Sequence, residues 1–313
     1  MISPTTRPTE HRQSNAAHPP ETLEGWFALH QIFRINRQAL DARTDVLARM
    51  GDAAAAALRV EDPKTGSSGG RGKKSGKDSP ARTGWSCFAR LIGSSSDLMV
   101  IHFRDSLDAI GVAQDALARQ EIMGVLQPTY TFLSVTEAGL YHVTAELARA
   151  AEARGGKVGD EEYVRSLAER SAAERSSEHI LKRLYPELPR EMPYVSFYPM
   201  SKRRDAGQNW YTLTLDERSR LMHSHGLTGR RYAGRIQQVI TGAIGLDAWE
   251  WGVTLFAADP LEFKKLVTDM RFDEVSSRYA EFGEFYVGKV VDASAWHGVP
   301  EQQQTAERIG SLK

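Results

Sequence analysis

The residues best suited to chemistry are concentrated in the segment 194–288. Within it, His225 follows Leu221 and Met222 at helical spacing, so its imidazole is expected on the apolar face of a helix. Gly226 is expected to end that helix. A histidine held in this way can point inward as a metal ligand. A hydrogen-bonded core histidine would give the same pattern, and the residues alone leave both interpretations open.

Hydroxyl and cationic side chains occur in the same segment. Tyr198 and Lys202 fall at the end of a predicted strand, whereas Arg271 and Ser276 fall near the end of a later helix. Such groups donate charge-assisted or neutral hydrogen bonds to an anionic ligand. The alternatives are a buried aromatic for Tyr198, surface cations for Lys202 and Arg271, and a helix-end hydroxyl for Ser276.

Composition limits the class of protein. The chain has 313 residues, 41% of them hydrophobic, and its 40 basic residues balance 40 acidic ones. This neutral balance predicts a globular protein that binds neither nucleic acid nor an anionic membrane through a global field. Cys87 is the sole cysteine, which excludes an internal disulfide, a thiolate cluster and the C-x-x-C-H pattern of covalent haem attachment. Residues 1–21 lack an apolar run, so we expect a disordered tail, no membrane span and a cytoplasmic location.

The elements that must position these residues form a repeat. The first half, residues 22–142, reads as strands Trp26–Phe33, Trp85–Ile92, Leu98–Phe103 and Tyr130–Val135 with helices Arg37–Met50 and Ser106–Arg119. The second half, residues 183–292, reads as strands Tyr194–Met200, Arg235–Thr241, Trp249–Phe256 and Phe282–Val287 with helices Leu215–His225 and Leu261–Val275. Both follow the order β-α-β-β-α-β.

This order predicts an α+β protein of two ferredoxin-like halves that bury their bare sheet faces against each other as a dimeric α+β barrel. The Gly, Ser and Lys-rich insertion 61–83 is expected to be flexible. Residues 143–182 are expected to form a helical connecting insertion broken at Gly155, and residues 293–313 a second tail.

Six ordered strings give the sequence a family resemblance. YPMSKRR, NWY, LMHSHGLTGRRYAG, QVITG, WEWGVTLF and MRFDEVSSRYAEFG resemble the coproheme decarboxylases of the chlorite dismutase superfamily, in the Gln-type form found in Firmicutes. The first half matches more loosely, through LEGWFALHQIF and PTYTFLSV. The fold of that family is the barrel that the element order suggests.

The resemblance implies a role for each candidate residue. His225 would be the axial ligand of a haem iron, and Tyr198 and Lys202 would be catalytic. The remaining substrate-binding candidates by resemblance are Arg183, Arg271, Ser276, Met200, Trp210, Gln238 and Tyr130. Gln238 is diagnostic, because the chlorite-degrading branch carries an arginine there whose fixed charge holds the anion, whereas this chain has a neutral amide.

The implied reaction is the hydrogen-peroxide-dependent oxidative decarboxylation of iron coproporphyrin III (coproheme) to haem b, the last step of coproporphyrin-dependent haem biosynthesis. Coproheme would be both substrate and redox cofactor, bound non-covalently, with Tyr198 relaying oxidation to a propionate. The family also implies a homopentamer and transient contact with coproporphyrin ferrochelatase. The alternatives are a chlorite dismutase-like or peroxidase haem enzyme, a non-catalytic haem-binding protein, and a barrel scaffold without cofactor.

Overall fold

A computed structural model describes residues 18–40, 44–59 and 84–298 of the chain. The predicted insertion 61–83 and most of both predicted tails lie outside these residues. In the N-terminal half the strands are β1 (Thr22–Ile35), β2 (Trp85–Leu91), β3 (Leu98–Arg104) and β4 (Leu126–Gly139), with helices α1 (Thr44–Ala57) and α2 (Leu107–Ala118) and the short turn η1 (Glu121–Gly124).

The C-terminal half repeats this order. Its strands are β5 (Tyr194–Lys202), β6 (Ile236–Gly242), β7 (Trp251–Ala257), the short β8 (Ala280–Phe282) and β9 (Tyr286–Val291), and its helices are α6 (Leu215–Arg230), α7 (Leu261–Arg271) and α8 (Glu274–Tyr279), with the short η2 (Trp210–Thr212). The predicted α+β class and the β-α-β-β-α-β order of both halves are therefore confirmed.

The strands form antiparallel ladders that connect the two halves edge to edge. The order is β7-β6-β4-β1-β3-β2-β9-β5-β8, and β7 also pairs with β5. The first half contributes β4-β1-β3-β2 and the second contributes β6-β7-β5-β9, and the halves meet at the β4–β6 and β2–β9 ladders. The pairings make a closed circuit, to which β8 adds beside the end of β5.

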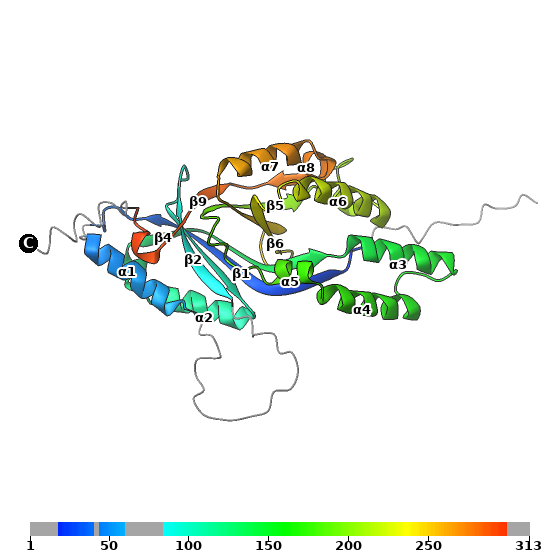
Figure 1. Ribbon diagram of the computed structural model, residues 1–313, viewed down its shortest axis with the longest axis horizontal. Helices are drawn as coiled ribbons and strands as arrows, with labels where there is room; N and C mark the ends of the chain where they lie inside the picture. The colour runs from blue at the N-terminus through cyan, green and yellow to red at the C-terminus, as the bar shows by residue number, and fades with distance from the viewer. Residues whose placement is uncertain (1–17, 41–43, 60–83, 299–313) are drawn as a thin grey trace, which may run out of the picture.

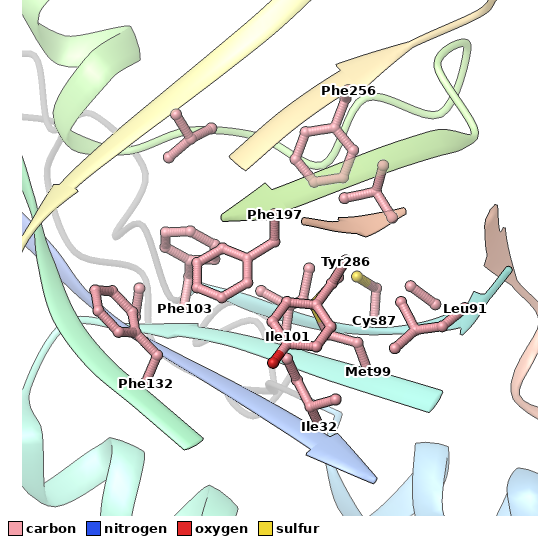
Figure 2. Packing of buried hydrophobic residues seen from close by; sticks show 14 of the residues in the cluster. Ile32, Cys87, Leu91, Met99, Ile101, Phe103, Phe132, Phe197, Phe256 and Tyr286 are labelled. Carbon is pink, nitrogen blue, oxygen red and sulfur yellow. The ribbon is translucent and has the colours of Figure 1, made fainter. Parts of the chain in front are cut away.

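The sheet faces that look inward share one apolar core. Strand alternation sends Phe103 and Phe132 from the first half, and Phe197 and Tyr286 from the second, into the same cluster (Figure 2). His30 lies in this interior, stacked on Phe197 with ring centroids 4.1 Å apart and its Nε2 within 2.9 Å of Thr254 Oγ1. Burial lowers the pKa of His30 to about 3, so it is a neutral core histidine.

The outward faces are covered by helices on opposite sides of the strands, α1 and α2 on one side and α6, α7 and α8 on the other (Figure 1). The predicted tail 293–313 is wrong at its start. Ala293–Ala295 form a short 3-10 turn, and Trp296 is fully buried under α1, where its Nε1 donates a hydrogen bond of 2.8 Å to Leu47 O. A single indole buries enough apolar surface to anchor a segment that has no periodic pattern.

The connecting segment holds α3 (Tyr141–Ala153), α4 (Glu161–Arg175) and α5 (Glu178–Leu184). The first two form a hairpin that projects from the rest of the molecule (Figure 1), with Gly155 at φ +75° in the turn. Helix α3 packs on α6, and Arg149 of α3 pairs with Asp216 of α6 at 2.5 Å. The connecting segment therefore packs against the C-terminal half, where α3 contacts α6.

Several predicted boundaries shift. Helix α6 runs through Gly226 to Arg230, because its last turns pack against α7, and a Cβ at Gly229 would lie only 3.4 Å from Met270 Cε. The helix predicted over 261–275 is two helices broken before Asp273, which caps α8. The strand predicted over 282–287 spans the gap between β8 and β9. Within the described ranges, no helix has the length and apolar character needed to cross a bilayer.

Candidate functional site

A cavity of about 1620 Å³ opens on the outward face of the C-terminal half. Its floor is the β5-β7-β6 ladder, its roof is α6 and α7, and residues of β4, α3 and α5 close one side. This space exceeds the roughly 300–1,000 Å³ of pockets for drug-sized ligands. We call it the C-terminal cavity.

Alternate residues of β5 place their side chains on the floor of the cavity. Tyr198, Met200 and Lys202 occur at every second position, so all three point to the outward face and line the cavity. Tyr198 is paired with Val253 and Met200 with Trp251 on β7, which also line it. The floor is therefore apolar, with a phenol in its middle and an ammonium at its end.

Helix α6 carries His225 across the roof. The helix starts at a capping box in which Thr214 and Glu217 bond reciprocally, which fixes its first turn. His225 lines the cavity, and its Nδ1 lies 2.7 Å from Asp273 Oδ2. A carboxylate only accepts, so Nδ1 carries a proton, and in the neutral ring Nε2 then has the lone pair that a metal can bind.

Asp273 was not among the predicted site residues. It caps α8, where its side chain accepts from the backbone N–H of Ser276, and it also holds the ring of His225. The available signal was an Asp three residues before Ser276 at a helix break, which is an N-cap pattern. The pattern does not reveal the second partner, because His225 is 48 residues away.

Tyr198 sits in an apolar wall. Its ring stacks on Phe285 at 4.3 Å and tilts against Phe282 at 5.9 Å. Burial raises the pKa of Tyr198 above its ordinary value, although the positive charge of Arg271 opposes the shift. The phenol therefore stays protonated near neutral pH and offers an O–H together with an oxidisable ring.

Lys202 lies at the edge of the same floor. Its Nζ is 4.5 Å from the ring centroid of Trp210, and its backbone N–H donates to Glu250 Oε2 at 2.7 Å. Burial lowers the pKa of Lys202 to about 8, and the carboxylates of Asp273 and Glu250 oppose this shift. Trp210 supports the ammonium as a cation–π partner but does not line the cavity itself.

Two arginines and a serine add hydrogen-bond donors at separate points. The guanidinium of Arg271 lies 3.9 Å from the Phe282 ring centroid, and the buried Ser276 lines the cavity nearby on α8. Arg183 lines the cavity from α5; burial lowers its pKa, and the negative charge of Glu137 opposes this. Arginine remains charged despite such shifts, so both guanidinium groups can bind carboxylates.

Gln238 points into the cavity from β6. Its side chain is exposed to the open space, and Gln238 Oε1 would lie 3.8 Å from a Cβ added at Gly229. The amide therefore lies beside the last turn of α6, the helix that carries His225. It can donate or accept a hydrogen bond but brings no fixed charge.

The structure brings most of the predicted residues together around the cavity and leaves two, Trp210 and Tyr130, outside its lining. Those that line the cavity are Tyr198, Met200, Lys202, Arg183, His225, Gln238, Arg271 and Ser276. Tyr130 packs against the inner core, with its ring stacked on Tyr286 at a centroid distance of 6.0 Å. Strand alternation places Tyr130 on the inward face of β4, which the cavity does not reach.

The donor set suits a metalloporphyrin better than a bare metal ion. Across residues 18–40, 44–59 and 84–298, no group of three or more His, Cys, Asp or Glu side chains could hold a metal ion. A porphyrin brings its own nitrogen ligands and needs one axial imidazole, a group that the Nε2 atom of His225 is free to provide. The apolar walls suit the macrocycle, and the cations of Lys202, Arg183 and Arg271 suit its carboxylates.

Comparison with known proteins agrees with this chemistry. The family model described as chlorite dismutase matches residues 74–291. A coproheme decarboxylase of Staphylococcus saprophyticus is 37% identical over 87% of this chain and 94% of its own length, and one of Staphylococcus carnosus is 34% identical over the same shares.

Solved structures show the same fold. A protein from Thermus thermophilus, described as a novel heme-binding protein, is 35% identical, with a TM-score of 0.68 over 89% of this chain and 96% of its own. A mutant chlorite dismutase from Candidatus Nitrospira defluvii is 14% identical, with a TM-score of 0.58 over 87% of this chain and 94% of its own, and shows the fold alone. The extent of the family match and of the curated relatives leads to one conclusion: the chain belongs to the chlorite dismutase family.

Proposed function

We propose that this protein is a coproheme decarboxylase, which converts iron coproporphyrin III to haem b with hydrogen peroxide as oxidant. The observation that carries the proposal is the C-terminal cavity itself, where His225, oriented by Asp273, and the buried phenol of Tyr198 face the same space. Two curated relatives of similar length and 34–37% identity carry the name coproheme decarboxylase, which supports the same substrate.

Each residue has a distinct task in this proposal. His225 Nε2 binds the iron of the substrate, while Asp273 fixes the tautomer and raises the basicity of the ring. Arg183, Lys202, Arg271 and Ser276 hold the propionates by hydrogen bonds from separate elements. Met200 on the floor contacts the macrocycle, and Trp210 acts only by supporting Lys202.

The chemistry balances with peroxide as the co-reactant. For each propionate, one peroxide and one proton are consumed, and the products are one vinyl group, carbon dioxide and two waters. Two electrons leave the side chain and reduce the peroxide O–O bond. Tyr198 is proposed to pass this oxidation to the propionate β-carbon as a neutral phenoxyl radical, because its raised pKa keeps the proton on the phenol until it is oxidised.

Positioning is the main physical contribution of the protein. Lys202 lies four residues after Tyr198 on β5, so both side chains point to the same face of the strand. A propionate bound by Lys202 is therefore held on the face that carries Tyr198. Such orientation can supply roughly 7–11 kcal/mol of barrier reduction in favourable cases. Lys202, whose pKa is lowered to about 8, can also give or take a proton near neutral pH.

The deciding experiment is to mix the purified protein with iron coproporphyrin III and hydrogen peroxide and to weigh the porphyrin. We expect products lighter by one and then two units of CO₂ and H₂ lost from the propionates. Tight binding with no change of mass would contradict the decarboxylase and favour a haem-binding protein.

The alternative enzyme is a chlorite dismutase, and the neutral side chain of Gln238 argues against that activity. A neutral amide does not pin a chlorite anion above the iron as a guanidinium would. We therefore expect little oxygen from chlorite with the wild type, measured with an oxygen electrode. Fast, sustained oxygen release would overturn the assignment.

The proposal includes a homopentamer, transient contact with coproporphyrin ferrochelatase and a cytoplasmic location. These stay predictions that rest on the family resemblance. Size-exclusion chromatography with light scattering would check the number of subunits.

A further inference from the structure

One carboxylate of the N-terminal half lines the C-terminal cavity and has no task in the mechanism above. Glu137 belongs to β4, which pairs with β6 at Val135–Gly242 and Thr136–Thr241. This ladder brings the side chain of Glu137 over Gly242, where an added Cβ would lie 2.3 Å from Glu137 Oε2. The glycine therefore makes the space that the carboxylate occupies, and Glu137 lines the cavity from there.

The surroundings of Glu137 come from several elements. The indole of Trp251 on β7 and the guanidinium of Arg183 on α5 both favour the ionised form of its carboxylate. Glu24 of β1, directly opposite in the β1–β4 ladder, repels it, and Tyr141 of α3 lies close enough to feel its charge. Burial is the largest influence and raises the pKa of Glu137 above its ordinary value despite Trp251 and Arg183.

Arg183 links this carboxylate to the substrate. In the proposed function Arg183 binds a propionate, so a second carboxylate arrives next to Glu137 in a partly dehydrated space. Two carboxylates that share a site cannot both stay ionised without a large cost, and one of them takes a proton. Glu137 is the better candidate, because its environment already favours the protonated form.

We propose that Glu137 takes up a proton when a porphyrin carboxylate binds beside Arg183, and that the resulting carboxylic acid donates a hydrogen bond to that carboxylate. The inference rests on the proposed function, since it requires a carboxylated porphyrin as ligand. It makes Glu137 a binding residue that recognises an anionic side chain only in its protonated state.

The sign of the pH dependence follows from linkage. In this proposal the pKa of Glu137 is higher in the complex than in the free protein. The affinity for the porphyrin is therefore greatest at pH values below the pKa of Glu137 in the free protein. It falls by up to about tenfold per pH unit between the two values and is constant above the higher one. Binding in the falling range takes up as much as one proton per site.

Calorimetry of the full-length protein with iron coproporphyrin III, without peroxide, tests this directly. Titrations in two buffers with different ionisation heats give the protons taken up, and a pH series gives the affinity. We expect Glu137→Gln to lose this proton uptake and to bind with a flatter pH profile, because an amide is neutral throughout.

Glu178→Gln is the matched control. Glu178 also lines the cavity, but it is exposed and pairs with Lys182 at 2.7 Å, which holds its pKa below the ordinary value. Its surroundings favour the ionised form, so its removal should leave the proton uptake of the wild type unchanged.

A second variant keeps the inference testable if the Glu137→Gln protein does not fold. Trp251→Phe removes the indole donor that stabilises the ionised form of Glu137, so the window of proton uptake should move to higher pH. An unchanged window in this variant, or wild-type proton uptake in a Glu137→Gln protein that binds, would overturn the inference and leave the proposed function intact.

The two proposals can fail separately. Proton uptake that depends on Glu137, without loss of carbon dioxide after peroxide is added, would refute the decarboxylase alone. A wild type that does not bind iron coproporphyrin III would refute both.

Discussion

The two halves of the molecule have the same element order and opposite contents beneath their helices. In the N-terminal half the space between the sheet and α1 and α2 is filled by large side chains, among them Phe33, Phe88, Leu117 and Trp296. In the C-terminal half the corresponding space is the C-terminal cavity. The difference lies in the side chains, because the backbone topology is shared.

Small and polar residues keep the second space open. Helix α6 presents Gly226 and Gly229 to the cavity, where α1 presents Leu47 and Met50 to its own sheet. The N-terminal half also receives Trp296 from the far end of the chain. The comparison teaches that one fold gives a packed core or a ligand site according to the volume of a few side chains.

The largest expected effect separates chemistry from packing inside the cavity. Tyr198→Phe keeps the ring stacked on Phe285 but removes the oxidisable phenol. We expect no product of lower mass after peroxide, while coproheme affinity is kept and the free energy of unfolding changes by only about 0.5–1.5 kcal/mol. Mass spectrometry and a Soret titration would check this.

The control for this variant lies on the opposite face of the same half. Tyr286→Phe removes a phenol that belongs to the inner core and does not line the cavity. It should turn over like the wild type. Completion of both decarboxylations by Tyr198→Phe at near wild-type speed would remove Tyr198 from the mechanism.

The next largest effect is expected when a large side chain is removed from the core of the N-terminal half. Trp296→Ala removes a fully buried indole and its bond to Leu47 O, so the free energy of unfolding should fall by about 3–5 kcal/mol. The C-terminal cavity should still bind coproheme in the folded fraction of the variant. Urea unfolding measures the loss, and a change below about 1 kcal/mol would mean that this half is not a core.

A smaller effect is expected where the ligand of the iron is oriented. Asp273→Asn keeps a helix cap for α8 but replaces the carboxylate that holds His225 Nδ1. Coproheme affinity or turnover should fall by roughly 10–100-fold, as for other partners of metal-binding histidines.

Asp269→Asn serves as its control, because Asp269 bonds Tyr232 and does not contact His225. An unchanged Soret spectrum and affinity in Asp273→Asn would show that another group orients the ligand. The removal of the ligand itself, His225→Ala, should alter the spectrum of bound coproheme in any case.

The smallest effect is confined to alkaline pH. The pKa of Lys202 in the folded chain is about 8, below the ordinary 10.5. Between these values the unfolded chain binds more protons, so this residue makes the free energy of unfolding rise as pH increases through that window. Lys202→Met should flatten the rise in urea unfolding measured without porphyrin, and an equally steep rise would contradict the burial of the ammonium.

The sequence by itself determined the order of elements and the segment that holds the chemistry. Periodicity placed Tyr198 and Lys202 at the end of a strand and His225 on a helix, and the helix predicted to begin at Leu215 begins at that residue. These signals are local, because each depends on residues within a few positions of one another.

Only the tertiary structure decided which distant side chains complete the site. The partner of His225 is Asp273, and the carboxylate near Arg183 is Glu137, from the other half of the chain. On β4, alternation places Tyr130 inward and Glu137 outward, but the sequence does not say that the outward face meets an open cavity. That depends on how β4 pairs with β6 and on which half Trp296 fills, and such long-range contacts leave no local pattern in the chain.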